Sequence, residues 1–143
     1  MRYSMKHFPR SAYDKVGELV YFARMLDKIR LMGEGKLPLD YHQNLGKGFD
    51  GRCTRFLHVD YNELRARVLQ GGTDEEILQW CFEKGRKPNE EEILIWNSFM
   101  VKRAWNDEAT PELEKYKTAS GLSDRKDIQT LFDYYGVDEG RKK

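Results

Sequence analysis

Apolar residues recur every three or four positions along most of the chain, which is the spacing of helices that pack on one side. In the first such stretch, with Ser11 as N-cap, the spacing predicts a helix over residues 13–32 whose apolar stripe is Val16, Leu19, Val20, Ala23 and Leu26. Because each helical residue turns by about 100°, Asp27 and Arg30 fall within this stripe. They need partners there, because an unpaired buried ion costs several kcal/mol.

Helix start and stop signals predict further helices along the rest of the chain. A polar loop over residues 40–47 leads into a second helix over residues 48–57. The later helices are predicted from Asp60 to Gly71, from the capping box of Thr73 and Glu76 to Gly85, from Asn89 to about residue 106, from Pro111 to Ala119, and from Ser123 or Asp124 to Gly136.

No stretch alternates between apolar and polar residues over the length of a strand. The sequence therefore predicts an all-α fold, a single compact domain of six or seven helices over residues 1–143. Residues 1–10 form a lead-in that Pro9 closes, and residues 137–143 form a tail.

Length and charge narrow the classes of function. At 143 residues, the chain can bury enough surface to fold without a metal or a disulfide. Its 25 Lys and Arg against 24 Asp and Glu give a net charge of +1, too weak a field to attract nucleic acid or an anionic membrane surface. Cys53 and Cys81 lie among apolar residues and predict reduced, buried thiols. Without a signal-peptide pattern or a long apolar run, we expect a cytoplasmic protein.

The loop over residues 40–47 is the most polar and aromatic loop, and it suggests a ligand site beside the first helix. In this hypothesis a small anionic or polar molecule binds between the helix at 13–32 and the loop at 40–52, with Asp27 and Arg30 as the floor. The candidate ligand-binding residues are Arg24, Asp27, Lys28, Arg30, Tyr41, His42, Asn44, Lys47, Asp50 and Arg52, with Asn97 as a supporting polar group.

Two alternatives for these residues stay open. His42, oriented by Asp27, is a candidate proton carrier near neutral pH, so acid or base catalysis could accompany binding. In the structural alternative, Asp27 and Arg30 are a buried ion pair that ties the first helix to the loop. Asn97, on an apolar helix face, is expected to bond a loop carbonyl or a neighbouring helix end.

Three other motifs are weak. Residues 46–51 fit G-x-G-x-x-G, but without a preceding strand they do not indicate a dinucleotide site, and only an anion seat at Gly48 beside Lys47 survives. Residues 60–84 resemble a helix-turn-helix, yet the second helix begins with three carboxylates that would face phosphate. The three histidines lie in separate segments, so we expect no metal and no cofactor.

Several separated runs together resemble one known family. They are YFARMLDKIR, LGKGFDGRCTRFL, GGTDEEILQWC, EEILIWN and LFDYYGVDEGR, and they span the chain from about Pro9 to Arg141. The chain is similar to the bacterial domain of unknown function family 5069. The resemblance implies a small stand-alone domain with no assigned activity, substrate or cofactor.

Function therefore remains a choice between two hypotheses. The first is the ligand pocket described above. The second is a non-catalytic interaction module or a homodimer, in which exposed aromatic residues such as Tyr3, Phe8, Phe99 and Trp105 form the contacting surface.

Overall fold

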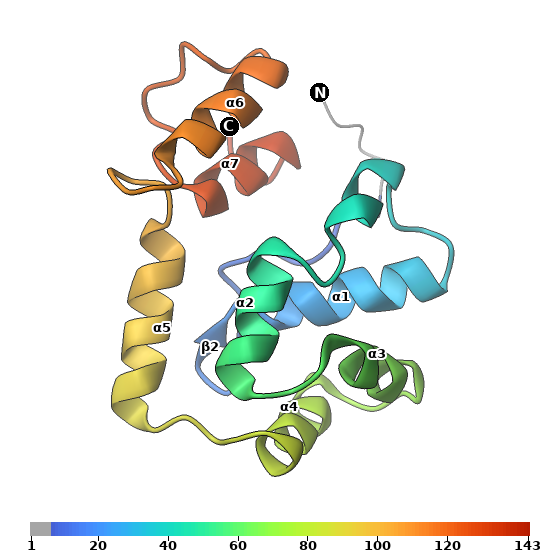
Figure 1. Cartoon of the computed structure of the whole chain (residues 1–143). Helices are drawn as coiled ribbons and strands as arrows, with labels where there is room; N and C mark the ends of the chain where they lie inside the picture. The colour runs from blue at the N-terminus through green and yellow to red at the C-terminus, as the bar shows by residue number, and fades with distance from the viewer. Residues whose placement is uncertain (1–6) are drawn as a thin grey trace.

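The computed structural model describes residues 7–143, and its secondary structure consists of helices and one short β-hairpin (Figure 1). In chain order, the elements are β1 (Lys15–Val16), β2 (Leu19–Val20), α1 (Phe22–Gly33), the 3-10 helix η1 (Leu39–Asn44), α2 (Gly48–Leu57), α3 (Tyr61–Leu69), α4 (Asp74–Lys84), α5 (Glu90–Lys102), α6 (Thr110–Ala119) and α7 (Leu131–Asp138). The predicted helical class is confirmed. With η1 included, the described part of the chain has eight helices, slightly more than the six or seven expected.

The predicted first helix is shorter than expected, because its first third is a β-hairpin. Strands β1 and β2 pair antiparallel, with Val16 opposite Leu19, and Gly17 and Glu18 turn the chain with φ of 52° and 70°. Glycine within a helix costs about 1 kcal/mol relative to alanine, and it takes positive φ without strain. The apolar residues of the stripe are buried as predicted, but Ser11 caps no helix and α1 begins only at Phe22.

Helix α5 holds this hairpin in place. The side chain of Asn97 accepts a hydrogen bond from the Val20 N–H (3.0 Å) and donates one to the Glu18 carbonyl (2.7 Å). The indole N–H of Trp96 donates to the Val20 carbonyl (3.1 Å). The expectation that Asn97 bonds a loop carbonyl is therefore confirmed, and its partner is the hairpin.

Local capping signals correctly predicted the starts of three helices. Asp60 caps α3, and the capping boxes that begin at Thr73 and Asn89 start α4 and α5. In each case the side-chain oxygen accepts a hydrogen bond from a backbone N–H of the first turn, which has no partner within the helix. These signals act within four residues, so the sequence alone is enough to find them.

Two helix ends differ from the prediction. Helix α5 ends at Lys102 rather than near residue 106, because Arg103 leaves the helical region and Ala104 has a φ of 86°. The last helix begins at Leu131 and is capped by Thr130, whose hydroxyl accepts from the Asp133 N–H (3.1 Å). The predicted start at Ser123 or Asp124 is therefore wrong.

Two apolar clusters make one compact domain. The larger surrounds α1 and includes Phe22, Leu26 and both cysteines, whereas the smaller joins α6 to α7. Phe49 and Tyr135 pack against both clusters and connect them. The cysteines are free and buried, and burial raises the pKa of both thiols, that of Cys81 to about 12.

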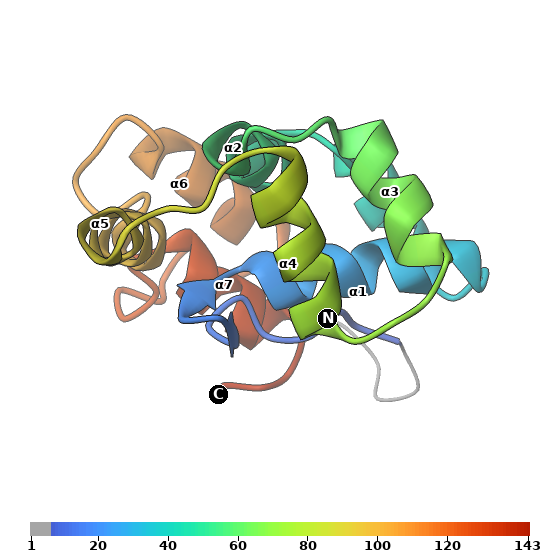
Figure 2. The same cartoon turned by 90° about the horizontal axis from the view of Figure 1, so that it is seen from below.

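Helix α5 lies along the outer edge of the molecule, with α6 and α7 beyond its C-terminal end (Figures 1 and 2). Its inner side packs on β2 and α7, while α3 packs on α1 and on its neighbours α2 and α4. None of the helices among residues 7–143 is both long enough and apolar enough to span a membrane.

Candidate functional site

A cavity of about 500 Å³ lies between α1, the segment from η1 to α2, and the pair α6 and α7. Five tyrosines line it together with ten charged side chains. The cations are Arg24, Lys28, Lys47, Arg52, Arg55 and Arg103, and the acids are Asp40, Glu112, Asp138 and Glu139. The lining therefore carries more positive than negative charge, in a protein whose overall net charge is only +1.

The first of two buried ion pairs in the cavity wall joins α1 to α2. Lys28 Nζ lies 2.9 Å from Asp50 Oδ1 and donates to the Tyr21 hydroxyl (3.0 Å), which itself donates to Asp50 Oδ1 (2.6 Å). The Gly46 N–H donates to the other Asp50 oxygen (3.1 Å). Burial lowers the pKa of Lys28 while Asp50 opposes that shift, and burial together with Asp50 raises the pKa of Tyr21.

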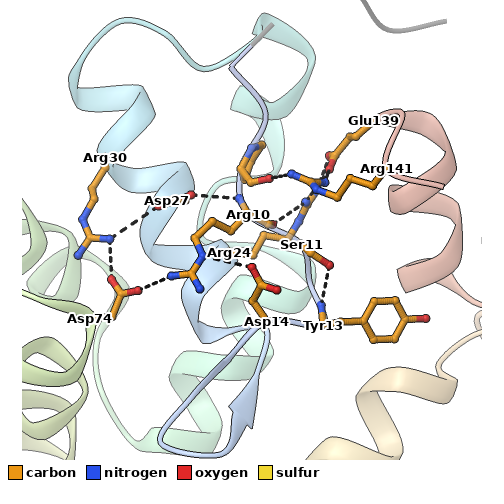
Figure 3. Close-up of polar contacts among 11 residues, drawn as sticks. Arg10, Ser11, Tyr13, Asp14, Arg24, Asp27, Arg30, Asp74, Glu139 and Arg141 are labelled. Atoms are coloured by element: carbon orange, nitrogen blue, oxygen red, sulfur yellow. Dashed lines mark hydrogen bonds and ion pairs between the residues drawn. The ribbon is translucent and has the colours of Figure 1, made fainter. Parts of the chain in front are cut away.

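The second buried ion pair joins α1 to the end of the chain. Arg24 donates two hydrogen bonds to the Glu139 carboxylate, at 2.9 and 2.7 Å, and the two side chains are only 4% and 1% exposed. The Tyr41 hydroxyl donates to Glu139 (2.5 Å). Arg141 binds Glu139 (Figure 3) and donates to the Pro9 carbonyl. Burial would raise the pKa of Glu139, but the hydrogen bonds and charge of Arg24 hold it below its usual value.

This second pair changes the interpretation of the chain end. The sequence predicts a tail over residues 137–143, whereas in the structure Asp138 and Glu139 line the cavity. The ring of Tyr135, on α7, lies 4.7 Å from the Arg24 guanidinium and completes the contact between α1 and α7.

Asp27 and Arg30 lie outside the cavity lining. Asp27 accepts a hydrogen bond from the Arg10 N–H (3.0 Å), and Arg30 lies 3.7 Å from Asp27 and 2.6 Å from Asp74 (Figure 3). Arg10 also binds Asp74 at 2.8 Å. These four residues, which we call the outer network, join α1 to the N-terminal segment and to α4. Asp27 and Arg30 therefore do not form the floor of this cavity.

The predicted pairing of His42 with Asp27 is also absent. The Nε2 atom of His42 lies 2.9 Å from the Leu37 carbonyl and donates to it, so the imidazole fixes the turn that precedes η1. Asp27 bonds Arg10 instead, and burial raises its pKa in spite of that bond. The acid–base arrangement suggested by the sequence is not formed.

Apart from Asn97, the remaining candidates lie at the cavity or directly behind it. Arg24, Lys28, Tyr41, Asn44, Lys47 and Arg52 line it. Asp50 is fully buried behind Lys28, and Asn97 supports the hairpin on another side of the domain.

Three cations of the lining have no ion-pair partner in the described part of the chain. They are Lys47, Arg52 and Arg55, which belong to α2 or precede it directly. Arg52 stacks on the ring of Phe99 (4.8 Å), and Arg103 lies over the same ring (5.1 Å). Burial lowers the pKa of Arg52, and the charges of Arg103 and Arg55 lower it further. Arg103 is paired with Asp107 and Glu108, each at 3.2 Å, so the positive charges without an ion-pair partner in the described chain are those of Lys47, Arg52 and Arg55.

The part of the cavity lining that α6 and α7 supply was not predicted from the sequence. Tyr134, Tyr135 and Glu139 belong to the run LFDYYGVDEGR, which contributed to the family resemblance, so a signal for them was present. Glu112 and Tyr116 lie in a helix whose pattern gave no such signal. Among residues 7–143, no group of three His, Cys, Asp or Glu side chains is placed to hold a metal ion.

These features define a small helical domain with a polar and aromatic cavity braced by two buried ion pairs. The model of the domain of unknown function family DUF5069 matches residues 6–141, nearly the whole chain, so the chain belongs to this family. The resemblance found from the sequence runs is thereby confirmed. No curated protein matched the chain.

Proposed function

We propose that this domain binds a small anionic molecule in the cavity. The observation that carries the proposal is the side of α2 that faces the cavity, where Lys47, Arg52 and Arg55 have no ion-pair partner in the described chain. Guanidinium groups bind carboxylate and phosphate through two parallel hydrogen bonds. A ligand with such a group would supply the negative charge that this side of the cavity lacks.

The start of α2 favours binding of the same anionic group of the ligand. Lys47 is the N-cap, and its side chain makes no capping hydrogen bond. The N–H groups of a first helical turn have no partner within the helix, and they favour an anion. Gly48 lines the cavity and has no side chain that would keep a ligand from the backbone.

The opposite wall suits the less polar part of a ligand. Tyr116 and Tyr134 stack with ring centroids 5.7 Å apart, and both line the cavity next to Tyr135. The hydroxyl of Tyr135 has no hydrogen-bond partner among the described residues, so it is available to a ligand. Aromatic walls with a few placed polar groups are typical of small-molecule sites.

The two buried ion pairs hold the frame of the cavity and do not supply the ligand's counter-charge. Arg24 and Lys28 are already neutralised by Glu139 and Asp50. Their rigid pairing keeps α1, α2 and α7 in place before any ligand arrives, which lowers the entropy cost of binding. We assign binding to this site, and no reaction.

The test is a thermal-shift and calorimetry series with inorganic phosphate, phosphate monoesters, small mono- and dicarboxylic acids and, as cationic controls, small amines. A ligand at 100 times its dissociation constant stabilises the folded state by about 2.7 kcal/mol, which moves the midpoint by several degrees in a domain of this size. We expect a shift with at least one class of anion and none with amines.

Salts such as phosphate can also stabilise the folded state without binding in the cavity, because they strengthen the burial of apolar surface. Variants distinguish this general effect from binding in the cavity. The double variant Arg52→Gln/Arg55→Gln should lose the ligand-induced shift. Arg65→Gln, which removes an exposed arginine of α3 that has no ion pair in the described chain, should keep it. Equal shifts in both variants, or no shift with any anion, would refute the proposal.

A further inference from the structure

The outer side of α5 is a continuous apolar stripe that nothing in the described chain covers. Leu94 and Ile95 are 65% and 60% exposed, Phe99 is 37% exposed, and Trp105 just beyond the helix is 52% exposed. They line a shallow groove together with Ser98, Lys102 and Asp107. Exposed apolar patches of this kind on a small domain mark interaction sites.

The charges at the two ends of this stripe are opposite in sign. Glu91 lies in the first turn of α5 and Lys102 in its last turn, and both are exposed. Neither has an ion-pair partner in the described chain. From Glu91 the stripe continues through Leu94, Ile95 and Ser98 to Lys102, at spacings of three and four, so all these side chains lie on one side of the helix.

This surface is complementary to itself in one orientation. When two copies of α5 pack antiparallel about a twofold axis, Glu91 faces Lys102 of the other copy and Leu94 faces Phe99. Ile95 then faces Ser98, whose small side chain leaves room for close approach. A parallel arrangement would bring like charges together at both ends, which is unfavourable.

We propose that the domain forms a homodimer through antiparallel packing of α5 about a twofold axis. The location of α5 along the outer edge of the molecule leaves its whole length accessible to a second copy (Figures 1 and 2). A twofold dimer uses the same patch on both subunits, and a self-complementary stripe meets that requirement. The partner's apolar side chains would fill the groove that ends at Trp105. The proposal is independent of the ligand proposed for the cavity.

The first test is the oligomeric state of the full chain, measured by sedimentation velocity and light scattering from micromolar to millimolar concentration. We expect a reversible shift from monomer to dimer. Ile95→Asp should weaken the dimer by roughly tenfold or more, because it buries a charge in both subunits. Leu39→Asp is the matched control, since Leu39 is 81% exposed and lies outside this stripe, and it should leave the dimer intact. A chain that stays monomeric throughout, or a dimer that survives Ile95→Asp, would overturn the proposal.

A charge exchange tests the orientation. Glu91→Lys and Lys102→Glu should each weaken the dimer, and the double variant should restore it, because each pair across the twofold axis regains opposite charges. Opposite charges at helix ends are also common because they complement the helix dipole. If the two charges only complement the helix dipole, the double variant should show an additive loss of helix stability, measured by circular dichroism. In that case the dimer should not recover. Absence of recovery would refute the antiparallel arrangement.

Discussion

The two charged networks on α1 differ in burial although they come from the same twelve-residue helix. Arg24 and Lys28 point into the domain, and their carboxylate partners Glu139 and Asp50 are almost completely buried. In the outer network, Asp27 and Arg30 keep 24% and 29% of their side-chain area exposed, and both bind groups near the surface. One set of ion pairs shapes a cavity, whereas the other fastens two segments to the outside of the helix.

The energetic consequence of this difference is large. Removing one partner of a buried pair leaves an unpaired ion in a medium that solvates it poorly, which costs about 3–5 kcal/mol. Partly exposed pairs regain water when broken, and they contribute about 0–1 kcal/mol. The same residue types on one helix are therefore expected to respond very differently to substitution.

The largest effect is expected for Glu139→Gln, which leaves the Arg24 guanidinium buried without its counter-charge. We expect the free energy of unfolding to fall by about 3–5 kcal/mol, measured by urea denaturation. The matched control in the outer network is Asp74→Asn, which breaks contacts with Arg10 and Arg30 and should cost about 1 kcal/mol or less.

Replacing both partners sharpens this result. Because an apolar pair of similar volume avoids the cost of burying charge, Arg24→Met/Glu139→Leu should be more stable than Glu139→Gln. Equal losses for Glu139→Gln and Asp74→Asn would erase the distinction between the two networks.

The dependence of stability on pH should carry opposite signs for the two networks. The pKa of Glu139 is lower in the folded state than its ordinary value of 4.5, so its contribution is present above pH 4.5 and is lost as the pH falls through the folded-state value. The pKa of Asp27 is raised above 3.8, so its contribution is full below pH 3.8 and is lost as the pH rises through the folded-state value. We expect the free energy of unfolding to decline on acidification below about pH 4.5.

Two variants test which residues cause this decline in the free energy of unfolding. Glu139→Gln should flatten the decline, measured by urea denaturation at a series of pH values, because its carboxylate no longer takes up a proton on unfolding. Asp27→Asn should steepen it, because the opposing contribution is lost. A flatter profile in Asp27→Asn would contradict the sign derived for that residue.

The smallest effect is expected for Asp27→Asn at neutral pH. The asparagine oxygen can still accept the hydrogen bond from the Arg10 N–H, and Arg30 keeps Asp74 as its partner. We expect a change below about 1 kcal/mol in the free energy of unfolding, and unchanged anion binding, since Asp27 does not line the cavity. A loss as large as that of Glu139→Gln would show that Asp27 behaves as a buried partner.

The starts of α3, α4 and α5 could be predicted from the sequence, and the orientation of charges on α1 could not. The caps at Asp60, Thr73 and Asn89 act over three residues, and all three predictions are confirmed. The prediction of which face of the first helix is buried rested partly on Val16, Leu19 and Val20. These residues are buried, but they belong to a hairpin. With those residues counted as helical, the apolar stripe was rotated toward Asp27 and Arg30.

Only the part of the site formed by residues close to α1 in the sequence was predictable. Lys47 and Arg52 follow Gly33, the last residue of α1, by only 14 and 19 residues, and the composition of the loop indicated them. Glu139 meets Arg24 across 115 residues, and helical periodicity contains no information on contacts of that range. The run containing Glu139 was visible as a motif, but its acidic and basic residues at the chain end are equally typical of a solvated tail.

The pairing of Arg24 with Glu139 also sets a condition on biosynthesis. On the ribosome, α1 is synthesised before Glu139, the carboxylate that pairs with its buried arginine 115 residues further along the chain. If α1 packed against α7 before Glu139 was available, the Arg24 charge would be buried without this partner, which costs several kcal/mol. We therefore expect the cavity to be completed as a late folding step, which requires that Glu139 has already been synthesised.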